Sequence, residues 1–343
     1  MSIFSRAAMA KALRLTRNGD LAGIASHLFE TLGDGLAAAA PVTVRDGEDI
    51  VPKAARGQPM GVADRFEKRS WHGPTGALDY HLFVPGTATP GMPLIIMLHG
   101  CTQSPEDFAR GTRMNALASE IGFLVAYPGQ TSAANAQRCW NWYRPGDQRR
   151  DLGEPAAIAG ITRQIIADEA ADPARVYVAG LSAGGAAAAI LAATYPDLYA
   201  AVGIHSGVAC GAASDMSGAL VAMHSGGVSP KGLAASFVPV ITFHGDRDQT
   251  VHEKNSRNIV SAAAAAAARP LHTASTTGTS AGGRSFTRDI SSDDAGRVLI
   301  ERWTVLGAGH AWAGGDSAGS YTDPKGPDAS REMLRFFMAH RLS

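Results

Sequence analysis

The stretch that decides the fold is RVYVAGLSAGGAAAAIL, residues 175–191. It opens with an apolar, valine-rich run typical of a buried strand and ends in alanines, the strongest helix formers. Between them lies Gly180-Leu181-Ser182-Ala183-Gly184, a G-x-S-x-G pattern. Small residues there let the backbone turn sharply and hold the serine in a strained conformation. Such a pattern also arises by chance in a chain rich in glycine and alanine, but its position between strand and helix predicts Ser182 as a nucleophile.

Apolar runs alternate with helix-length segments on both sides of this stretch. We expect strands at 66–71, 78–84, 93–100, 123–129, 175–180, 199–207, 239–245 and 297–307. We expect helices at 105–120, 155–169, 183–194, around the alanine run 261–268, and from about 328 to the end. The Gly/Ser/Thr-rich segment 273–284 is predicted to be an exposed loop. This alternation predicts an α/β-hydrolase fold, with a mostly parallel sheet, helices on both faces, and a ligand site beyond the carboxyl ends of the strands.

A serine hydroxyl is a weak nucleophile, so it needs a general base that a carboxylate orients. In this class of fold the order along the chain is serine, then an acid, then histidine. The strand at 239–245 is followed by Asp246 and Asp248, and the strand at 297–307 is followed by His310 in a glycine-rich loop. We therefore predict His310 as the base rather than an incidental loop residue. Asp248 is favoured as the acid because it lies farther into its turn, whereas Asp246 is expected to bond its own backbone.

Acyl transfer also requires donors for the oxyanion that develops in the transition state. One should be the backbone N–H of Ala183, directly after the nucleophile, and the second should come from a loop after an earlier strand. Here that loop is HGCTQ, residues 99–103, and the N–H of Cys101 is the candidate. His99 is interpreted as a structural support for the loop and not as a reacting group.

The overall composition of the chain limits the classes of function that remain possible. The chain has 343 residues, is 45% hydrophobic, and balances 31 basic with 31 acidic residues. Zero formal charge provides no overall field for nucleic acid or an anionic membrane, and no stretch approaches the roughly 18 apolar residues of a membrane span. We expect residues 1–62 to form a helical N-terminal extension and linker, and residues 63–343 to form the catalytic domain.

Five motifs of the chain resemble the polyhydroxybutyrate depolymerase-type esterase family, which is related to feruloyl and acetylxylan esterases. They are HGCTQSPEDFA (99–109), RCWNWYRPGDQ (138–148), GLSAGGA (180–186), HGDRDQTV (244–251) and GAGHAWAGG (307–315). The resemblance covers about residues 64–343. It implies the same assignments, with Ser182, Asp248 and His310 as the triad and Cys101 and Ala183 as the oxyanion donors.

The loops placed at the site supply few charges. We expect the substrate-binding surface to be formed by Thr102, Trp140, Trp142, Leu181 and Trp312, although aromatic residues are more often found in the core. A surface of this kind favours a neutral, compact acyl group. The expected function is hydrolysis of short-chain acyl or hydroxyalkanoate esters. The alternatives are a feruloyl or acetylxylan esterase, a peptidase on the same fold, and a non-catalytic binding module.

The three cysteines, Cys101, Cys139 and Cys210, lack the C-x-x-C spacing of zinc sites. One disulfide with a spare thiol and three reduced thiols are both compatible with this number. Because Cys101 and Cys139 lie in loops at the carboxyl ends of adjacent predicted strands, we expect a disulfide between them, with Cys210 unpaired. We expect no metal and no cofactor. The N-terminus lacks an uninterrupted apolar signal segment, so the sequence predicts a cytoplasmic location, whereas members of the family it resembles are often extracellular.

Overall fold

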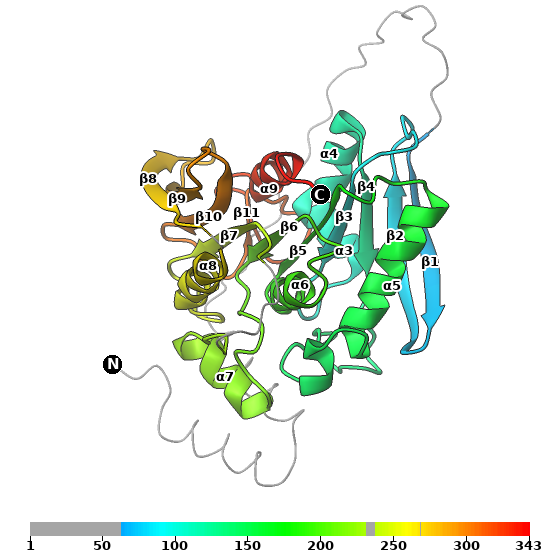
Figure 1. Ribbon diagram of the computed structural model, residues 1–343, viewed down its shortest axis with the longest axis horizontal. Helices are drawn as coiled ribbons and strands as arrows, with labels where there is room; N and C mark the ends of the chain where they lie inside the picture. Colours follow the sequence, from blue (N-terminus) through cyan, green and yellow to red (C-terminus); the bar gives the residue numbers. More distant parts are fainter. Residues whose placement is uncertain (1–62, 231–236, 268) are drawn as a thin grey trace, which may run out of the picture. The chain divides into compact units, whose positions relative to one another are not determined.

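The computed structural model describes residues 63–230, 237–267 and 269–343. The expected N-terminal extension at 1–62 lies outside the described residues. A ten-stranded sheet forms the centre, in the order β1-β2-β4-β3-β5-β6-β7-β10-β9-β8 (Figure 1). The strands are β1 (Arg65–Gly73), β2 (Gly76–Val84), β3 (Leu94–Leu98), β4 (Leu124–Pro128), β5 (Val176–Leu181), β6 (Ala201–His205), β7 (Val240–Gly245), β8 (His272–Thr279), β9 (Ser285–Ser292) and β10 (Val298–Val305).

The six central strands, from β4 to β10, run parallel, and antiparallel hairpins extend the sheet at both edges. The predicted mostly parallel α/β-hydrolase sheet is therefore present. The strands nearest its middle, β3 to β6, are buried along their whole length, as their continuous apolar runs require. Since parallel strands end at the same edge of the sheet, the loops after β3, β5, β7 and β10 converge there.

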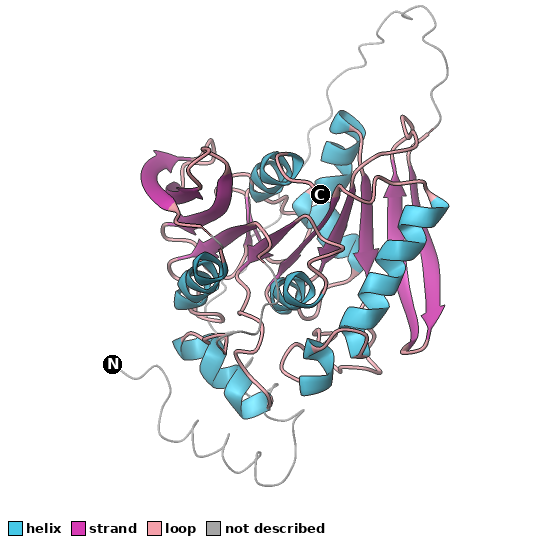
Figure 2. Cartoon of the chain, in the orientation of Figure 1, coloured by secondary structure: helices cyan, strands magenta, loops and turns pink. Residues whose placement is uncertain are grey.

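Helices cover both faces of the sheet (Figure 2), and each face has its own apolar core. One face carries α5 (Gly153–Asp168), α6 (Ala183–Thr194), α7 (Met216–Ser225) and α8 (Lys254–Ala266). The other carries α3 (Pro105–Thr112), α4 (Met114–Ile121) and α9 (Ala329–Met338). The short elements η1 (Pro145–Gln148), β11 (Trp312–Ala313) and β12 (Thr322–Asp323) complete the described structure.

Two predictions of secondary structure were wrong. The helix expected at 105–120 is two helices, because Arg113 adopts a left-handed conformation with φ 55° that ends α3 and begins α4. The loop expected at 273–284 is mostly strand β8, which pairs with β9 along its whole length. Its threonines favour an extended backbone, but almost every β8 residue is exposed, so the strand shows no apolar alternation in the sequence.

Candidate active site

Ser182 occupies a strained turn between β5 and α6, with φ 58° and ψ −119°. The flanking glycines make this turn sterically feasible. A Cβ on Gly184 would lie 2.0 Å from the carbonyl oxygen of Leu98, and one on Gly180 would lie 2.3 Å from that of Gly184. No larger residue fits at either position unless the backbone moves. The G-x-S-x-G segment therefore forms the tight strand-to-helix turn expected from the sequence, with a partly exposed serine at its apex.

Asp248 and His310 meet across the ends of β7 and β10. His310 Nδ1 donates to Asp248 Oδ2 at 2.7 Å, while Asp248 Oδ1 accepts from the backbone N–H groups of Thr250 at 2.9 Å and Val251 at 2.8 Å. Burial disfavours the charged carboxylate, but the hydrogen bonds and charges of His244 and His310 outweigh burial and hold the pKa of Asp248 well below its usual value. The ionised acid fixes the His310 tautomer that leaves Nε2 free to accept a proton.

His244 is a member of this site to which sequence reasoning assigned no role. It is the fifth residue of β7, it is buried, and its Nε2 donates to the carbonyl oxygen of Val251 at 2.7 Å. The same nitrogen lies 3.4 Å from Asp248 Oδ2. Asp246, the rejected acid, accepts from the backbone N–H of Gly307 at 2.6 Å. It therefore ties the β7 turn to the β10 turn, whereas the sequence analysis expected it to bond its own backbone.

The loop after β3 lies against the serine. A Cβ built on Gly100 would be 3.6 Å from Ser182 Cβ, and the Gly100 N–H donates to Gln103 Oε1 at 2.9 Å. Ala183 is the first residue of α6, so its N–H has no partner within the helix. The two backbone donors proposed for an oxyanion thus lie on segments that the structure brings together around Ser182.

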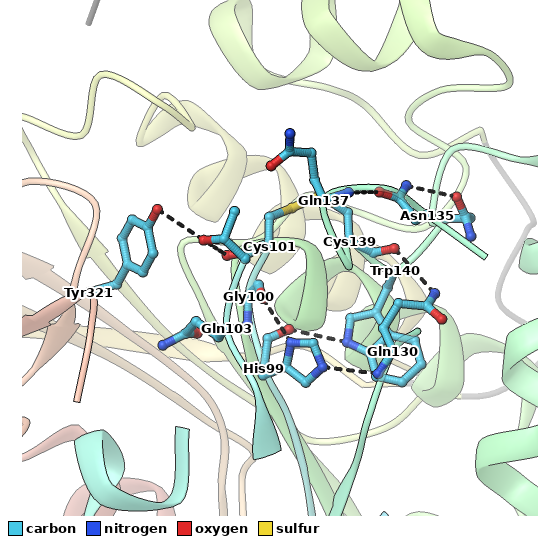
Figure 3. The surroundings of a disulfide bond; sticks show 12 residues. His99, Gly100, Cys101, Gln103, Gln130, Asn135, Gln137, Cys139, Trp140 and Tyr321 are labelled. Carbon is cyan, nitrogen blue, oxygen red and sulfur yellow. Dashed lines mark hydrogen bonds between the residues drawn. A yellow bond between two sulfur atoms is a disulfide. The ribbon is translucent and has the colours of Figure 1, made fainter. Parts of the chain in front are cut away.

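A second loop, which contains Gln137 and Cys139, is bonded to the loop of Cys101 (Figure 3). A disulfide joins Cys101 to Cys139, and Cys210 is a buried free thiol. The backbone N–H of Thr102 donates to the Gln137 carbonyl at 2.6 Å, and Arg138 Nη2 donates to the Thr102 carbonyl at 2.8 Å. The loop that carries the proposed oxyanion donor is therefore fixed by one covalent bond and a pair of reciprocal hydrogen bonds.

A sequence profile described as "Esterase PHB depolymerase" matches residues 78–281 of the chain. The chain belongs to this family. It is 31% identical over 247 residues to poly(3-hydroxyalkanoate) depolymerase C of Paucimonas lemoignei. This alignment covers 68% of this chain and 58% of that protein. It is 34% identical over 130 residues to feruloyl esterase B of Neurospora crassa. That alignment covers 38% of this chain and 44% of the Neurospora protein.

The chain spans about half the length of the curated relatives it matches. Among solved structures, the acetyl xylan esterase from Aspergillus awamori superposes with a TM-score of 0.64 at 18% identity, over 80% of this chain and 99% of that one. At this identity the likeness shows the fold alone. The PHB depolymerase-family chain thus shares the fold of that protein, in agreement with the α/β-hydrolase fold predicted from the sequence.

Two buried histidines support the site of this PHB depolymerase-family chain. His99 Nδ1 donates to the Gly100 carbonyl at 2.8 Å, while Nε2 accepts from the Gln130 N–H at 3.1 Å. Burial lowers the pKa of His99 to about 4, so the ring is neutral near pH 7. His205 stacks on Trp312, and its Nε2 accepts from the Ala313 N–H at 2.9 Å. The contacts of His99 agree with the structural role expected for it, and those of His205 tie the end of β6 to the loop after His310.

Glu154 is a further residue that sequence reasoning missed, and it anchors the tryptophan-containing loop. Its carboxylate accepts from the Asn141 N–H at 2.7 Å, from Asn141 Nδ2 at 2.5 Å and from Gln130 Nε2 at 2.5 Å. Burial, with the charge of Asp147, raises the pKa of Glu154 to about 7. Gln130 also donates to the Cys139 carbonyl at 3.2 Å. The network therefore extends from Glu154 through Gln130 to Cys139 of the disulfide.

Three of the residues predicted to contact the substrate have almost no accessible surface in the structure. Trp140 is 0% exposed and its Nε1 donates to the His99 carbonyl, whereas Trp312 is 1% exposed and its Nε1 donates to Ser330 Oγ. Leu181 is likewise buried. Their side chains pack in the core beside the candidate site and offer no accessible surface for a substrate contact. Trp142 is 7% exposed, and Thr102 is half-buried beside Cys101.

Within residues 63–230, 237–267 and 269–343, the structure contains no group of three histidine, cysteine, aspartate or glutamate side chains arranged to hold a metal ion. None of the helices in the described part of the chain combines the length and the apolar character needed to cross a membrane. A shallow hollow lined by Gly91, Pro93, Glu120 and Arg175 lies at the amino ends of the parallel strands, away from the site.

Replacement of Cys139 by serine should lower kcat about tenfold, since a small misplacement of an oxyanion donor has a large effect on the rate. The hydrogen bonds from Thr102 and Arg138 remain in this variant, which limits the loss. Steady-state kinetics on p-nitrophenyl butyrate measure the effect, and Cys210→Ser is the matched control because it removes only a free thiol. Mass mapping of a non-reduced digest that found Cys101 and Cys139 both as thiols would contradict the bridge.

Proposed function

We propose that this chain is a serine carboxylic-ester hydrolase, with residues 63–343 as its catalytic domain. The observation that carries the proposal is the 2.7 Å hydrogen bond from His310 to the buried, ionised Asp248, at the sheet edge where the strained Ser182 turn also lies. An acid held in its charged state and a base held in one tautomer are what a serine needs to become nucleophilic.

The proposed reaction proceeds through an acyl-enzyme. His310 Nε2 accepts the proton of Ser182 Oγ as the oxygen attacks the ester carbonyl. The N–H groups of Cys101 and Ala183 donate to the resulting oxyanion, which collapses as the alcohol leaves with the proton from His310. Water then attacks the acyl-enzyme with His310 as the base. The N–H groups lie on a clamped loop and on a helix N-terminus, so they need little reorganisation as charge develops.

The proposed substrates are short-chain acyl or hydroxyalkanoate esters. The PHB depolymerase family and the Paucimonas relative support the hydroxyalkanoate class. A feruloyl or acetylxylan esterase is the second candidate, and the name of the Neurospora relative favours the feruloyl activity. A peptidase and a non-catalytic binding module are less well supported, the latter because Ser182, Asp248 and His310 are all present.

We expect kcat/KM to peak at acetyl to butyryl esters or hydroxybutyryl units and to fall with longer acyl chains. A tunnel for long chains would add binding of about 0.8 kcal/mol for each buried methylene and would raise specificity steadily with chain length. A series of p-nitrophenyl esters from acetyl to decanoyl, compared with hydroxybutyrate oligomers and with feruloyl and acetyl sugar esters, measures the preference. A continuous rise through decanoyl would contradict the proposed class, and hydrolysis of none of these esters would contradict the proposed function.

A further inference from the structure

Glu154 lies in the first turn of α5, where an acidic residue commonly stabilises a helix through its charge. Here another side chain caps the turn, since the Glu154 N–H donates to Asp147 Oδ1 at 2.8 Å. Within the described residues, the Glu154 carboxylate accepts hydrogen bonds from the loop after β4 and from none of the α5 N–H groups. Its bonds therefore serve that loop, and helix stability does not explain them.

The donors that face the Glu154 carboxylate are neutral amides. Asn141 donates through its backbone N–H and its Nδ2, and Gln130 donates through Nε2. Among the residues that the structure describes, no lysine, arginine or histidine forms an ion pair with Glu154, and the charged group beside it is the acidic Asp147. Removing a carboxylate from water without a cation partner destabilises a fold, so stability does not account for Glu154.

One route from Glu154 to the oxyanion loop, residues 99–103, runs through Gln130. The Gln130 side chain donates to Glu154, and its backbone N–H donates to His99 Nε2 at 3.1 Å. Because Nε2 is an acceptor, the proton of this neutral ring lies on Nδ1, which donates to the Gly100 carbonyl at 2.8 Å. Figure 3 shows both bonds of His99. The position of Gln130 thus sets the tautomer and the orientation of the His99 ring.

A second route runs through Asn141 and its neighbour Trp140. Glu154 accepts from the Asn141 N–H, and Trp140, directly before it, donates from Nε1 to the His99 carbonyl at 3.1 Å. Glu154 therefore holds the loop after β4 at two points, Gln130 and Asn141. Both points are connected to His99, one through its ring and the other through its carbonyl oxygen.

The Gly100 carbonyl and the Cys101 N–H belong to one planar peptide group. A bond that holds the carbonyl oxygen therefore also fixes the direction of the N–H on the other side of the plane. Within the described residues, the Cys101 N–H donates to no protein group, so it is available to an oxyanion. The other N–H groups that follow His99 in the oxyanion loop are occupied: Gly100 donates to Gln103 Oε1, Thr102 to the Gln137 carbonyl and Gln103 to the Gly100 carbonyl.

We propose that Glu154 is a positioning residue, which directs the Cys101 N–H toward the oxyanion by holding Gln130 and Asn141. The inference rests on the proposed ester hydrolysis, and Glu154 acts on that reaction through the oxyanion loop and not through the substrate. An ionised carboxylate suits the position because it accepts from all three donors. A protonated carboxyl or an amide would instead present a proton of its own to one of them.

The ionisation of Glu154 makes this positioning depend on pH. Burial, and then the charge of Asp147, raises the pKa of Glu154 to about 7, so the carboxylate is ionised above that pH and protonated below it. His99 is the titratable group beyond Gln130, and burial lowers its pKa to about 4, so it remains neutral where Glu154 titrates. The Cys101 N–H should therefore be held firmly above about pH 7 and less firmly below it.

Glu154→Gln should lower kcat on p-nitrophenyl butyrate about tenfold at about pH 8.5 and leave KM within about twofold. Complete loss of an oxyanion donor costs about 10²- to 10³-fold, and here the donor is displaced but still present. Inhibition by a trifluoromethyl ketone, whose adduct with Ser182 carries the oxyanion, should weaken by the same factor as kcat. The ratio of wild-type to variant kcat should fall toward one at about pH 5.5, where Glu154 is protonated in the wild type. Titration of His310 affects both proteins alike and cancels in this ratio.

Two further variants complete the test. Asp147→Asn retains an oxygen for the Glu154 N–H but removes the charge that raises the Glu154 pKa. Its kcat should match that of wild type at about pH 8.5 and exceed it about twofold at about pH 6.5, because more Glu154 stays ionised there. Glu120→Gln is the matched control, since Glu120 is an exposed acid on α4 that bonds to Arg331. Its kcat relative to wild type should not change with pH.

A ratio of wild-type to Glu154→Gln kcat that stays constant with pH, or a loss carried by KM, would show a merely structural role and overturn the inference. If Tm measurements show that Glu154→Gln does not fold, the Asp147→Asn profile decides, and a profile identical to that of wild type overturns the inference. Wild-type protein that cleaves no ester would contradict the proposed function itself, a result distinguishable from failure of the Glu154 inference alone.

Discussion

Ser182→Ala should reduce ester hydrolysis by about 10⁴-fold or more, as removal of a triad nucleophile does in other serine hydrolases. Without Oγ no acyl-enzyme forms, and only the oxyanion donors and binding contacts remain to accelerate the reaction with water. The fold should persist, because the Ser182 side chain makes no capping hydrogen bond to α6 and alanine fills the same space. Initial rates on p-nitrophenyl butyrate, with Tm from circular dichroism, test both parts.

Ser206→Ala is the matched control for this experiment. Ser206 also follows a parallel strand and has a positive φ, of 48°, but within the described residues its Oγ forms a hydrogen bond with His205 Nδ1, at 3.2 Å, and not with the proposed base. We expect that variant to lose less than about tenfold, the effect of a weakened supporting contact. A fluorophosphonate probe should label wild type and Ser206→Ala but not Ser182→Ala. Labelling of Ser182→Ala, or turnover near that of wild type in a verified preparation, would disprove the nucleophile assignment.

The central fold could be predicted because its signals are local. Continuous apolar runs identify buried parallel strands, and the glycines around Ser182 show where a strand must turn into a helix. The hairpin of β8 and β9 could not be predicted in the same way. The residues of β8 are almost all exposed and those of β9 are mostly half-buried, so the position of the hairpin depends on pairing with β10 and not on an apolar pattern.

The places of the candidate residues could be predicted where chain order and strand ends determine them: Ser182 follows β5 and His310 follows β10, as expected. Roles that long-range contacts assign could not be predicted in this way. In the sequence, Glu154 is an ordinary acidic residue near the start of a helix. In the structure, its carboxylate accepts hydrogen bonds from Asn141 and Gln130. The tryptophans were predicted to contact the substrate, but Trp140 and Trp312 are buried and pack in the core. The sequence alone does not distinguish an aromatic residue that packs in the core from one that contacts a substrate.

Asp248→Asn should lower kcat/KM by about 10⁴-fold, because an amide in this position favours the wrong tautomer of the base. The Asp248 carboxylate accepts from His310 Nδ1 through one oxygen and from the Thr250 and Val251 N–H groups through the other. An asparagine has one acceptor oxygen. If it faces the two backbone donors, its NH₂ group faces His310 and meets a nitrogen that must itself donate.

Asp246→Asn is the comparison that separates the two aspartates. Asp246 uses one oxygen to accept from the Gly307 N–H at 2.6 Å, and the carbonyl oxygen of an asparagine can accept the same bond. Its loss of activity should therefore stay within about tenfold, the range expected for one weakened hydrogen bond. Parallel kcat/KM and Tm measurements on both variants distinguish a catalytic loss from unfolding. If both variants fold and Asp246→Asn loses more activity than Asp248→Asn, the role of the acid belongs to Asp246. That result would override the contact between His310 and Asp248, because the role of the acid is defined by its effect on activity.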